Sequence, residues 1–213
     1  MLSKKIFLLI FILFASYSQF VWAKTNNNES ELTVEADESL EWFEKEKYYL
    51  AKGNVVLKKD DLTLKANTIK ADYVFENGEN ILKKIIAIDK VILTKENAKA
   101  TGQYMTYDLK RKIARISGSF QTFQSPAGYV ESKKIIIFDE LNNKAEAEGN
   151  VKIILSNKTI IYADNVKADF EPTNKSLKKA IAKGNVVIEN KAKSRKSKAD
   201  LGVYNSNDEI IRL

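Results

Sequence analysis

One short phrase, Ala-x-Gly-Asn-Val-x-aliphatic, occurs three times in this chain and constrains its fold more than any other feature. Good copies begin at Ala51, Ala147 and Ala182, and degenerate copies begin at Ala87 and Ile116. Counted at the glycine position (53, 89, 118, 149 and 184), neighbouring copies are 36, 29, 31 and 35 residues apart. This wandering period indicates one small structural unit per repeat, with length differences absorbed in turns.

The pattern inside the phrase indicates β-strands. Positions 1, 3, 5 and 7 are small or aliphatic, whereas positions 2, 4 and 6 are mostly polar, and this period of two is typical of a strand with one apolar face. A second phrase built on Ala-Asp recurs at residues 71, 163 and 199, and turn formers follow at 76–78, 140–143 and 172–174. Since no stretch after the N-terminal segment shows helical periodicity with caps, we predict an all-β chain with almost no helix.

Units of two or three strands are too small to bury their own apolar faces, so they are expected to stack around a shared interior. The stripe of small residues at positions 1 and 3 either lets two sheets approach closely or leaves room for something narrow and apolar. A filled β-solenoid core is the simpler alternative. Either arrangement predicts one inner wall formed by Val55, Leu57, Val91, Leu93, Val151, Ile153, Val186 and Ile188.

The N-terminus is typical of an export signal. Lys4 and Lys5 precede an apolar run from residue 6 to 15, and Val21 and Ala23 supply small residues for cleavage. We predict a signal peptide over residues 1–23 cleaved after Ala23, a flexible segment over 24–31 and one domain over 32–213. An uncleaved anchor is the alternative, because residues 20–22 extend the apolar stretch.

The composition excludes catalysis and metal binding that depend on histidine or cysteine. The chain has no histidine and no cysteine, so we predict no enzyme, no catalytic residues, no metal site and no cofactor. The acidic residues that recur with the repeat are expected to be structural, because an active site occurs once; they are Asp72, Asp164, Asp169 and Asp200.

The positive charge of the chain is spread along it. The net charge is +7, but only four of the basic residues are arginines, and no basic block is interleaved with aromatic residues. Nucleic acid is therefore not an expected partner. One local cluster of positive charge is either a solvated strand face or a site for anionic lipid head groups; it contains Lys193, Arg195, Lys196 and Lys198.

The two alternating phrases resemble the organic-solvent-tolerance or lipopolysaccharide-transport A family, and the resemblance runs from Leu32 to Leu213. It implies an elongated β-jellyroll of stacked antiparallel strands, open at both ends, that holds the acyl chains of lipopolysaccharide inside. It also implies a periplasmic bridge that carries this lipid from the inner to the outer membrane. The implied partners are the inner-membrane and outer-membrane transport components, joined by strand addition at the sheet edges, and copies of the same chain arranged head to tail.

On this interpretation the lipid contacts the inward apolar side chains. The predicted set is Val55, Leu57, Leu64, Ile69, Val91, Leu93, Met105, Phe120, Ile135, Ile137, Val151, Ile153, Val166, Val186 and Ile188. Two alternatives stay open, namely an exported β-repeat scaffold with a filled core and a membrane-tethered protein of the same fold. The strand expected over 208–213 would leave an open edge for a partner, unless the natural chain continues beyond it.

Overall fold

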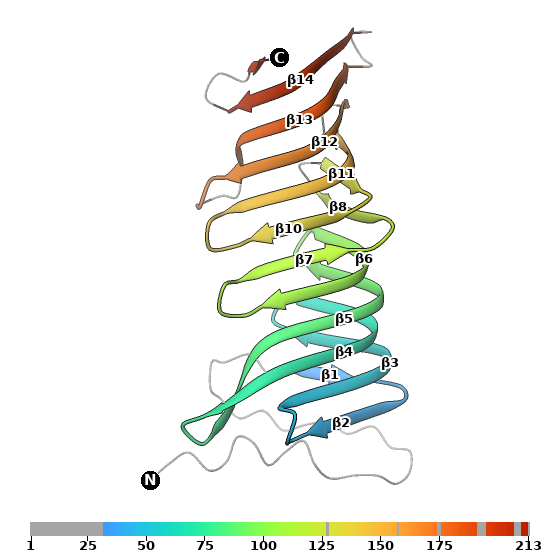
Figure 1. The fold of residues 1–213 in the computed structure, drawn as a ribbon, viewed down its shortest axis with the longest axis vertical. Coiled ribbons are helices and arrows are strands. Elements are labelled where there is room, and N and C mark those ends of the chain that lie inside the picture. The colour runs from blue at the N-terminus through green and yellow to red at the C-terminus, as the bar shows by residue number, and fades with distance from the viewer. Residues whose placement is uncertain are drawn as a thin grey trace.

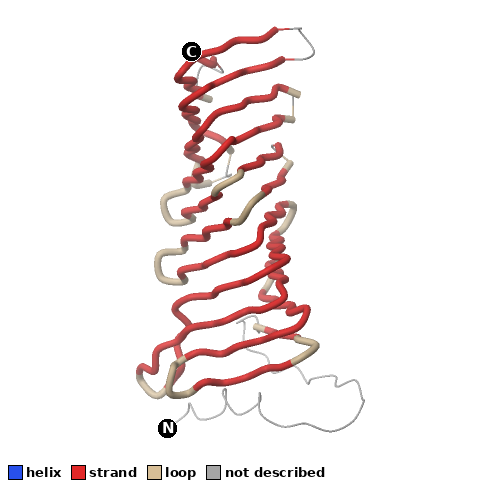
Figure 2. Tube along the Cα trace, turned by 45° about the vertical axis from the view of Figure 1, so that its right-hand side comes forward, coloured by secondary structure: helices blue, strands red, loops and turns tan. Residues whose placement is uncertain are grey.

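The computed structural model describes residues 32–126, 128–156, 158–173, 176–190, 195–206 and 210–212. The predicted signal peptide and the predicted flexible segment both lie outside these residues. Figure 2 shows strands joined by short turns, and the described ranges contain no helix, which confirms the all-β prediction. Within the same ranges, no helix is long and apolar enough to cross a bilayer.

Antiparallel strands stack along one long axis, from β2 near one end to β14 near the other (Figure 1). They are β1 (Thr33–Glu35), β2 (Ser39–Phe43), β3 (Tyr48–Lys59), β4 (Leu62–Glu76), β5 (Glu79–Lys95), β6 (Ala98–Asp108), β7 (Ile113–Ser117), β8 (Gln121–Ser125), β9 (Gly128–Ser132), β10 (Ile135–Asp139), β11 (Lys144–Leu155), β12 (Thr159–Phe170), β13 (Leu177–Asn190), β14 (Arg195–Asn205) and β15 (Ile210–Arg212).

All these strands form one hydrogen-bonded sheet in which each strand pairs with near neighbours in the sequence. Three pairs of short strands act as single long strands that are interrupted in the middle. β7 and β8 both pair with β6, β9 and β10 both pair with β11, and β1 and β2 both pair with β3. Each long strand therefore has two arms separated by a break.

The break is a sharp corner, and the Gly-Asn of the repeat forms it. Gly53 and Asn54 have φ angles of 81° and 42°, and Gly184 and Asn185 have φ angles of 74° and 49°. The pairing register shifts at these positions, because two residues of one strand lie opposite one residue of the next strand. Two successive left-handed residues bend the strand, and Gly and Asn tolerate that conformation best.

The corners divide the sheet into two walls. Wall 1 consists of β2, β7, β10, β15 and residues 48–52, 68–76, 79–88, 104–108, 144–148, 165–170, 177–183 and 201–205. Wall 2 consists of β1, β8, β9 and residues 55–59, 62–66, 91–95, 98–102, 151–155, 159–163, 186–190 and 195–199.

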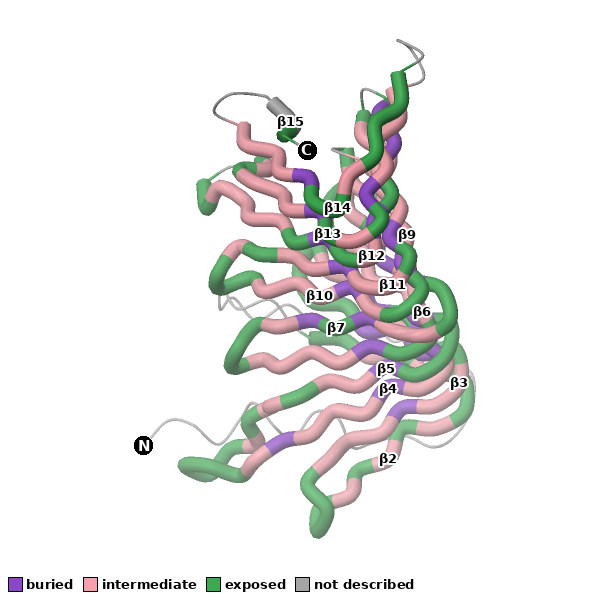
Figure 3. Tube along the Cα trace, turned by 45° about the horizontal axis from the view of Figure 1, so that its top comes forward, coloured by how far each residue is buried: buried purple, intermediate pink, exposed green. Residues whose placement is uncertain are grey.

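The two walls pack against each other and enclose the core. One core cluster combines side chains of β3 to β7 from both walls, and a second combines side chains of β10 to β13. Phe123 of wall 2 and Phe138 of wall 1 contact both clusters. Figure 3 shows the buried residues as a band that crosses successive strands. The architecture is thus an elongated β-jellyroll, as the sequence predicts.

Candidate functional site in the apolar interior

The inner face of wall 1 carries a continuous row of apolar side chains beside the corner. Each member lies directly opposite the next in the register, and all of them are buried. The row is Ala51, Ile69, Ala87, Met105, Ile116, Ile136, Ala147, Val166 and Ala182. The alanine of the repeat is therefore a lining residue of the interior.

A matching row runs along the inner face of wall 2. It contains Val34, Leu57, Leu64, Leu93, Ala100, Phe123, Val130, Ile153, Ile161 and Ile188, again as successive register partners. Leu57, Leu64 and Ala100 are buried, whereas Val34, Leu93, Phe123 and all members from β9 onward are half-buried. The fully buried members of this row therefore all lie on β3 to β6, and the members on β11 to β13 are partly accessible.

The walls differ along the stack in side-chain size as well. The second row of wall 1 begins at the β2 end, where Trp42 lies opposite Tyr49, and it mixes large and small residues as far as Phe138 on β10. From β10 to β13 this row reads Phe138, Ala145, Ala168 and Ala180. Three successive alanines therefore line this part of wall 1. We call the interior between residues 144–190 of the two walls the slot.

Aromatic rings close the interior at the β2 end. The Trp42 indole nitrogen donates a hydrogen bond of 2.7 Å to the Tyr73 hydroxyl, and Asn80 donates one of 2.7 Å to the Tyr49 hydroxyl. The rings of Tyr49 and Tyr73 are 4.9 Å apart. Burial raises the pKa of Tyr49 above its ordinary value, so the phenol stays neutral and can take part in this network.

Most of the predicted lipid-contacting residues lie on these inner faces. The structure brings together Val55, Leu57, Leu64, Ile69, Val91, Leu93, Met105, Val151, Ile153, Val166, Val186 and Ile188 in the two core clusters or packed against them. The inward orientation expected for them agrees with this packing. Their contact with a lipid stays a prediction.

The inward placement predicted for Phe120 is wrong, because 48% of its surface is exposed. The corner between β7 and β8 has three residues, Gly118, Ser119 and Phe120, where the other corners that lead from wall 1 into wall 2 have two. The extra residue displaces Phe120 from the interior and moves Gln121 into the position that the repeat assigns to valine. The degenerate copy that begins at Ile116 does not reveal this extra residue, because its residues also fit the repeat without an insertion.

The inward placement predicted for Ile135 and Ile137 is also wrong. Ile136 is buried in the second cluster and Phe138 packs against it, so alternation places Ile135 and Ile137 on the opposite face. Four apolar residues in succession carry no period-two signal, which is why the sequence did not reveal the phase of this strand.

Glycine at position 3 does not line the interior either. A Cβ atom on Gly53 would lie within 2.5 Å of Glu38 Cγ, and one on Gly149 would lie 2.6 Å from Lys134 Cβ. Glu38 and Lys134 lie in the neighbouring breaks of the same sheet, between β1 and β2 and between β9 and β10. The glycine is therefore small so that adjacent strands can approach at the corner, and the repeated acids help there, since Asn185 donates a 2.9 Å hydrogen bond to Asp164.

The outer faces of the walls carry ion pairs between neighbouring strands, including Lys152 with Glu131 at 3.6 Å and Lys167 with Glu146 at 2.9 Å. Of the predicted basic cluster, Lys196 pairs with Glu189 at 2.7 Å, and Lys193 lies outside the described residues. Such pairs are typical of a solvated sheet surface and contribute little each.

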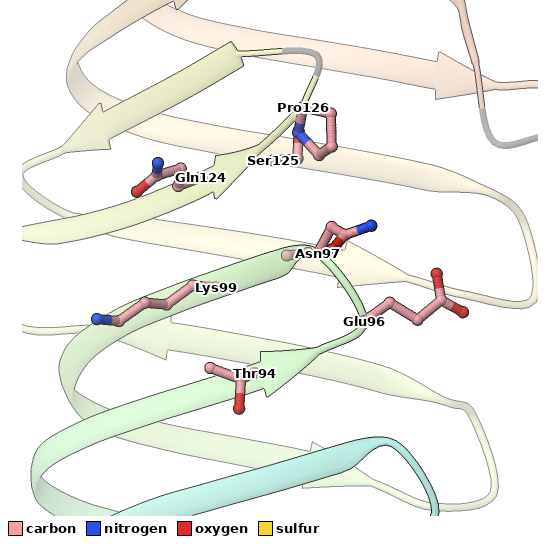
Figure 4. Close-up of a pocket in the computed structure, with 8 residues that line it drawn as sticks. Thr94, Glu96, Asn97, Lys99, Gln124, Ser125 and Pro126 are labelled. Carbon is pink, nitrogen blue, oxygen red and sulfur yellow. The ribbon is translucent and has the colours of Figure 1, made fainter.

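A hollow of about 480 Å³ lies at the tips of wall 2, between the β5–β6 turn and the end of β8. Figure 4 shows Glu96, Lys99 and Gln124 among the side chains that line it. Among the described residues, no three His, Cys, Asp or Glu side chains gather closely enough to hold a metal ion.

Comparison with known proteins gives one family match and one similar solved structure. The profile of the family described as "LptA/(LptD N-terminal domain) LPS transport protein" matches residues 33–139 and 129–213. The solved structure of LptH, the LptA-homologous periplasmic component of the lipopolysaccharide transport device of Pseudomonas aeruginosa, matches with 17% identity and a TM-score of 0.44. That match covers 51% of this chain and 76% of LptH. No curated protein gives a significant match.

The two family matches together span nearly all of the described residues, from β1 to the C-terminal strand. The family consists of transport proteins rather than enzymes, as the composition predicts. The chain therefore belongs to the LptA/LptD N-terminal domain family of lipopolysaccharide transport proteins.

Proposed function

We propose that this protein carries lipopolysaccharide with the acyl chains in the slot and the sugars outside it. The observation that carries the proposal is the change in the interior along the stack. Leu57, Leu64 and Ala100 of the wall 2 row are buried near β3 to β6, whereas Ile153, Ile161 and Ile188 of the same row are half-buried. An acyl chain lying there would cover apolar surface that otherwise faces water.

Burial of hydrocarbon supplies the affinity in this proposal. Each Å² of apolar surface removed from water contributes about 25 cal/mol, so one long acyl chain gains several kcal/mol without a polar partner. Since the inner rows offer few polar atoms, the slot is suited to lipids with different head groups.

Bridging between membranes is proposed through the open edges of the sheet. Among the described residues, β1 and β2 pair only with β3, and β15 pairs only with β14. Unpaired strand edges can add a strand from another chain, which is how inner-membrane and outer-membrane components, or head-to-tail copies, would dock. The periplasm is the proposed location, and a mature protein starting near Lys24 in N-terminal sequencing would support cleavage and exclude a tether.

Photocrosslinking in cells tests the proposed lipid position. A photoreactive amino acid at Ile153 or Ile161 should capture lipopolysaccharide, because both side chains lie on the inner face of wall 2. The same amino acid at Lys152, which pairs with Glu131 on the outer face, is the control and should capture none. Equal labelling at Ile153 and Lys152, or none at either inner position, would contradict the proposal.

A filled-core scaffold is the second candidate, and the burial of Leu57, Leu64 and Val91 in the interior near β3 to β6 favours it. The two candidates differ at Ile153. A scaffold would give no lipid adduct at that position in purified protein mixed with lipopolysaccharide, whereas a carrier would give one.

A further inference from the structure

Five corners lead from wall 1 into wall 2. The first residue after each corner occupies the same place in the repeat and is buried. Four of them hold valine, namely Val55, Val91, Val151 and Val186, and each is at most 1% exposed. The fifth holds Gln121, which is 0% exposed. The extra residue in the corner of β7 and β8 brings this glutamine to the valine position.

The Gln121 side chain is unpaired there. Neither its amide nitrogen nor its amide oxygen has a hydrogen-bond partner among the described residues. Its register partner Ser132 is also buried, but the Ser132 hydroxyl bonds to the carbonyl oxygens of Ile135 and Glu148. On the other side lies Gly102, where an added Cβ would be 3.7 Å from Gln121 Cγ. A buried amide without a partner is costly to folding, so its presence needs a reason.

The position of Gln121 suggests that reason. It lies where the two core clusters meet, two residues closer to the corner than Phe123, whose ring packs across the interior on Phe138. Side chains two residues apart share a face, so Gln121 and Phe123 both face the opposite wall. A hydrocarbon chain inserted between the rings of Phe123 and Phe138 would therefore reach the side-chain amide of Gln121.

We propose that Gln121 hydrogen-bonds a hydroxyl group carried by an acyl chain that inserts between Phe123 and Phe138. This inference rests on the proposed lipid-carrying function and adds a specificity-determining residue to it. An amide both donates and accepts, and a hydroxyl group does the same, so the pair would satisfy each other in an apolar surrounding. A plain hydrocarbon chain would leave the amide unpaired.

Binding of two matched probes tests the inference. The probes are 3-hydroxytetradecanoic acid and tetradecanoic acid, titrated into purified wild-type protein, Gln121→Val and Gln124→Val. Valine is the residue at the four equivalent corners, and Gln124 is an exposed glutamine of the same strand that serves as the control. Wild type and Gln124→Val should prefer the hydroxylated probe by about tenfold, whereas Gln121→Val should show no preference.

Thermal unfolding gives an independent measurement. Removing an unpaired buried amide should raise the melting temperature of Gln121→Val by about 2–4 °C, and Gln121→Met, which keeps the side-chain length, should behave alike. A lower melting temperature in both variants would mean that the amide has a partner within the protein, which overturns the inference. So would equal binding of both probes by wild type, or a preference that survives in Gln121→Val. Failure of wild type to bind either probe would instead contradict the proposed function.

Discussion

Phe123 on wall 2 packs against Phe138 on wall 1, with ring centroids 4.9 Å apart and planes tilted by 54°. The pair joins strands from the two walls at the place where the two core clusters meet. Because no backbone hydrogen bond links β8 to β10, this ring contact is one of the interactions that hold the walls together in the middle of the stack.

A double-mutant cycle with Phe123→Leu and Phe138→Leu should therefore reveal coupling. Aromatic pairs in this geometry contribute about 0.5–1.5 kcal/mol beyond the area that they bury, so the two losses should not add. Urea unfolding of the two single variants and the double variant measures the coupling energy. Strictly additive losses would mean that the rings stabilise their own walls separately.

The second prediction concerns Gly184, which lies at a corner between the two walls. Gly184→Ala should destabilise the fold, because Gly184 has a φ of 74° and an added Cβ would overlap the Asp164 side chain. The left-handed conformation alone costs an alanine about 1–2 kcal/mol, and the overlap adds to this. Gly78→Ala is the matched control, since Gly78 has a φ of 84° but nothing within 4 Å of the added atom. Denaturant unfolding should show the larger loss in Gly184→Ala, and equal losses would contradict the close approach of strands at the corner.

Polarity in the slot should affect lipid capture more than folding. Ile153→Asn places an amide on the half-buried inner face of wall 2, where it would disrupt burial of an acyl chain. Loss of one aliphatic contact corresponds to about 1.5–3 kcal/mol, which predicts at least tenfold weaker binding of lipopolysaccharide. Lys152→Asn, on the outer face, should bind like wild type. Retained binding in Ile153→Asn would place the lipid elsewhere.

Alkaline unfolding tests the interior through a tyrosine. Burial, followed by the nearby Glu140 carboxylate, raises the pKa of Tyr107 from 10.0 to about 12. A group whose pKa is raised on folding contributes stability below its unfolded pKa, and this contribution is lost as the pH rises through the folded pKa. Stability should therefore fall between about pH 10 and pH 12, and part of that fall should vanish in Tyr107→Phe. An identical pH dependence of unfolding in both proteins would show that Tyr107 is accessible to water.

The repeat predicted the fold because one part of it indicates where the backbone bends and the other part indicates which side chains face inward. Gly-Asn predicts a left-handed bend, and the flanking alternation predicts which residues face inward, so Ala51, Val55 and Leu57 were placed correctly from spacing alone. The hairpin at Asn77 and Gly78 follows in the same way, since φ angles of 53° and 84° suit this dipeptide.

Two features could not be read from the sequence because they depend on register. One inserted residue at 118–120 changes which side chain enters the core, and only pairing with β6 reveals it. The gradient from a filled to an accessible interior is equally hidden. Ala145, Ala168 and Ala180 are far apart in the chain and form a row only once β11 to β13 are paired.

The near-neighbour pairing of the strands also governs how the molecule comes apart. Each strand depends mainly on the ones beside it, so the stack behaves as a one-dimensional array whose ends can fray while the middle stays folded. Such contacts are local in the sequence, and folding can begin at any hairpin and spread in both directions. Changing the number of strand pairs would therefore change the length of the protein without requiring a new core.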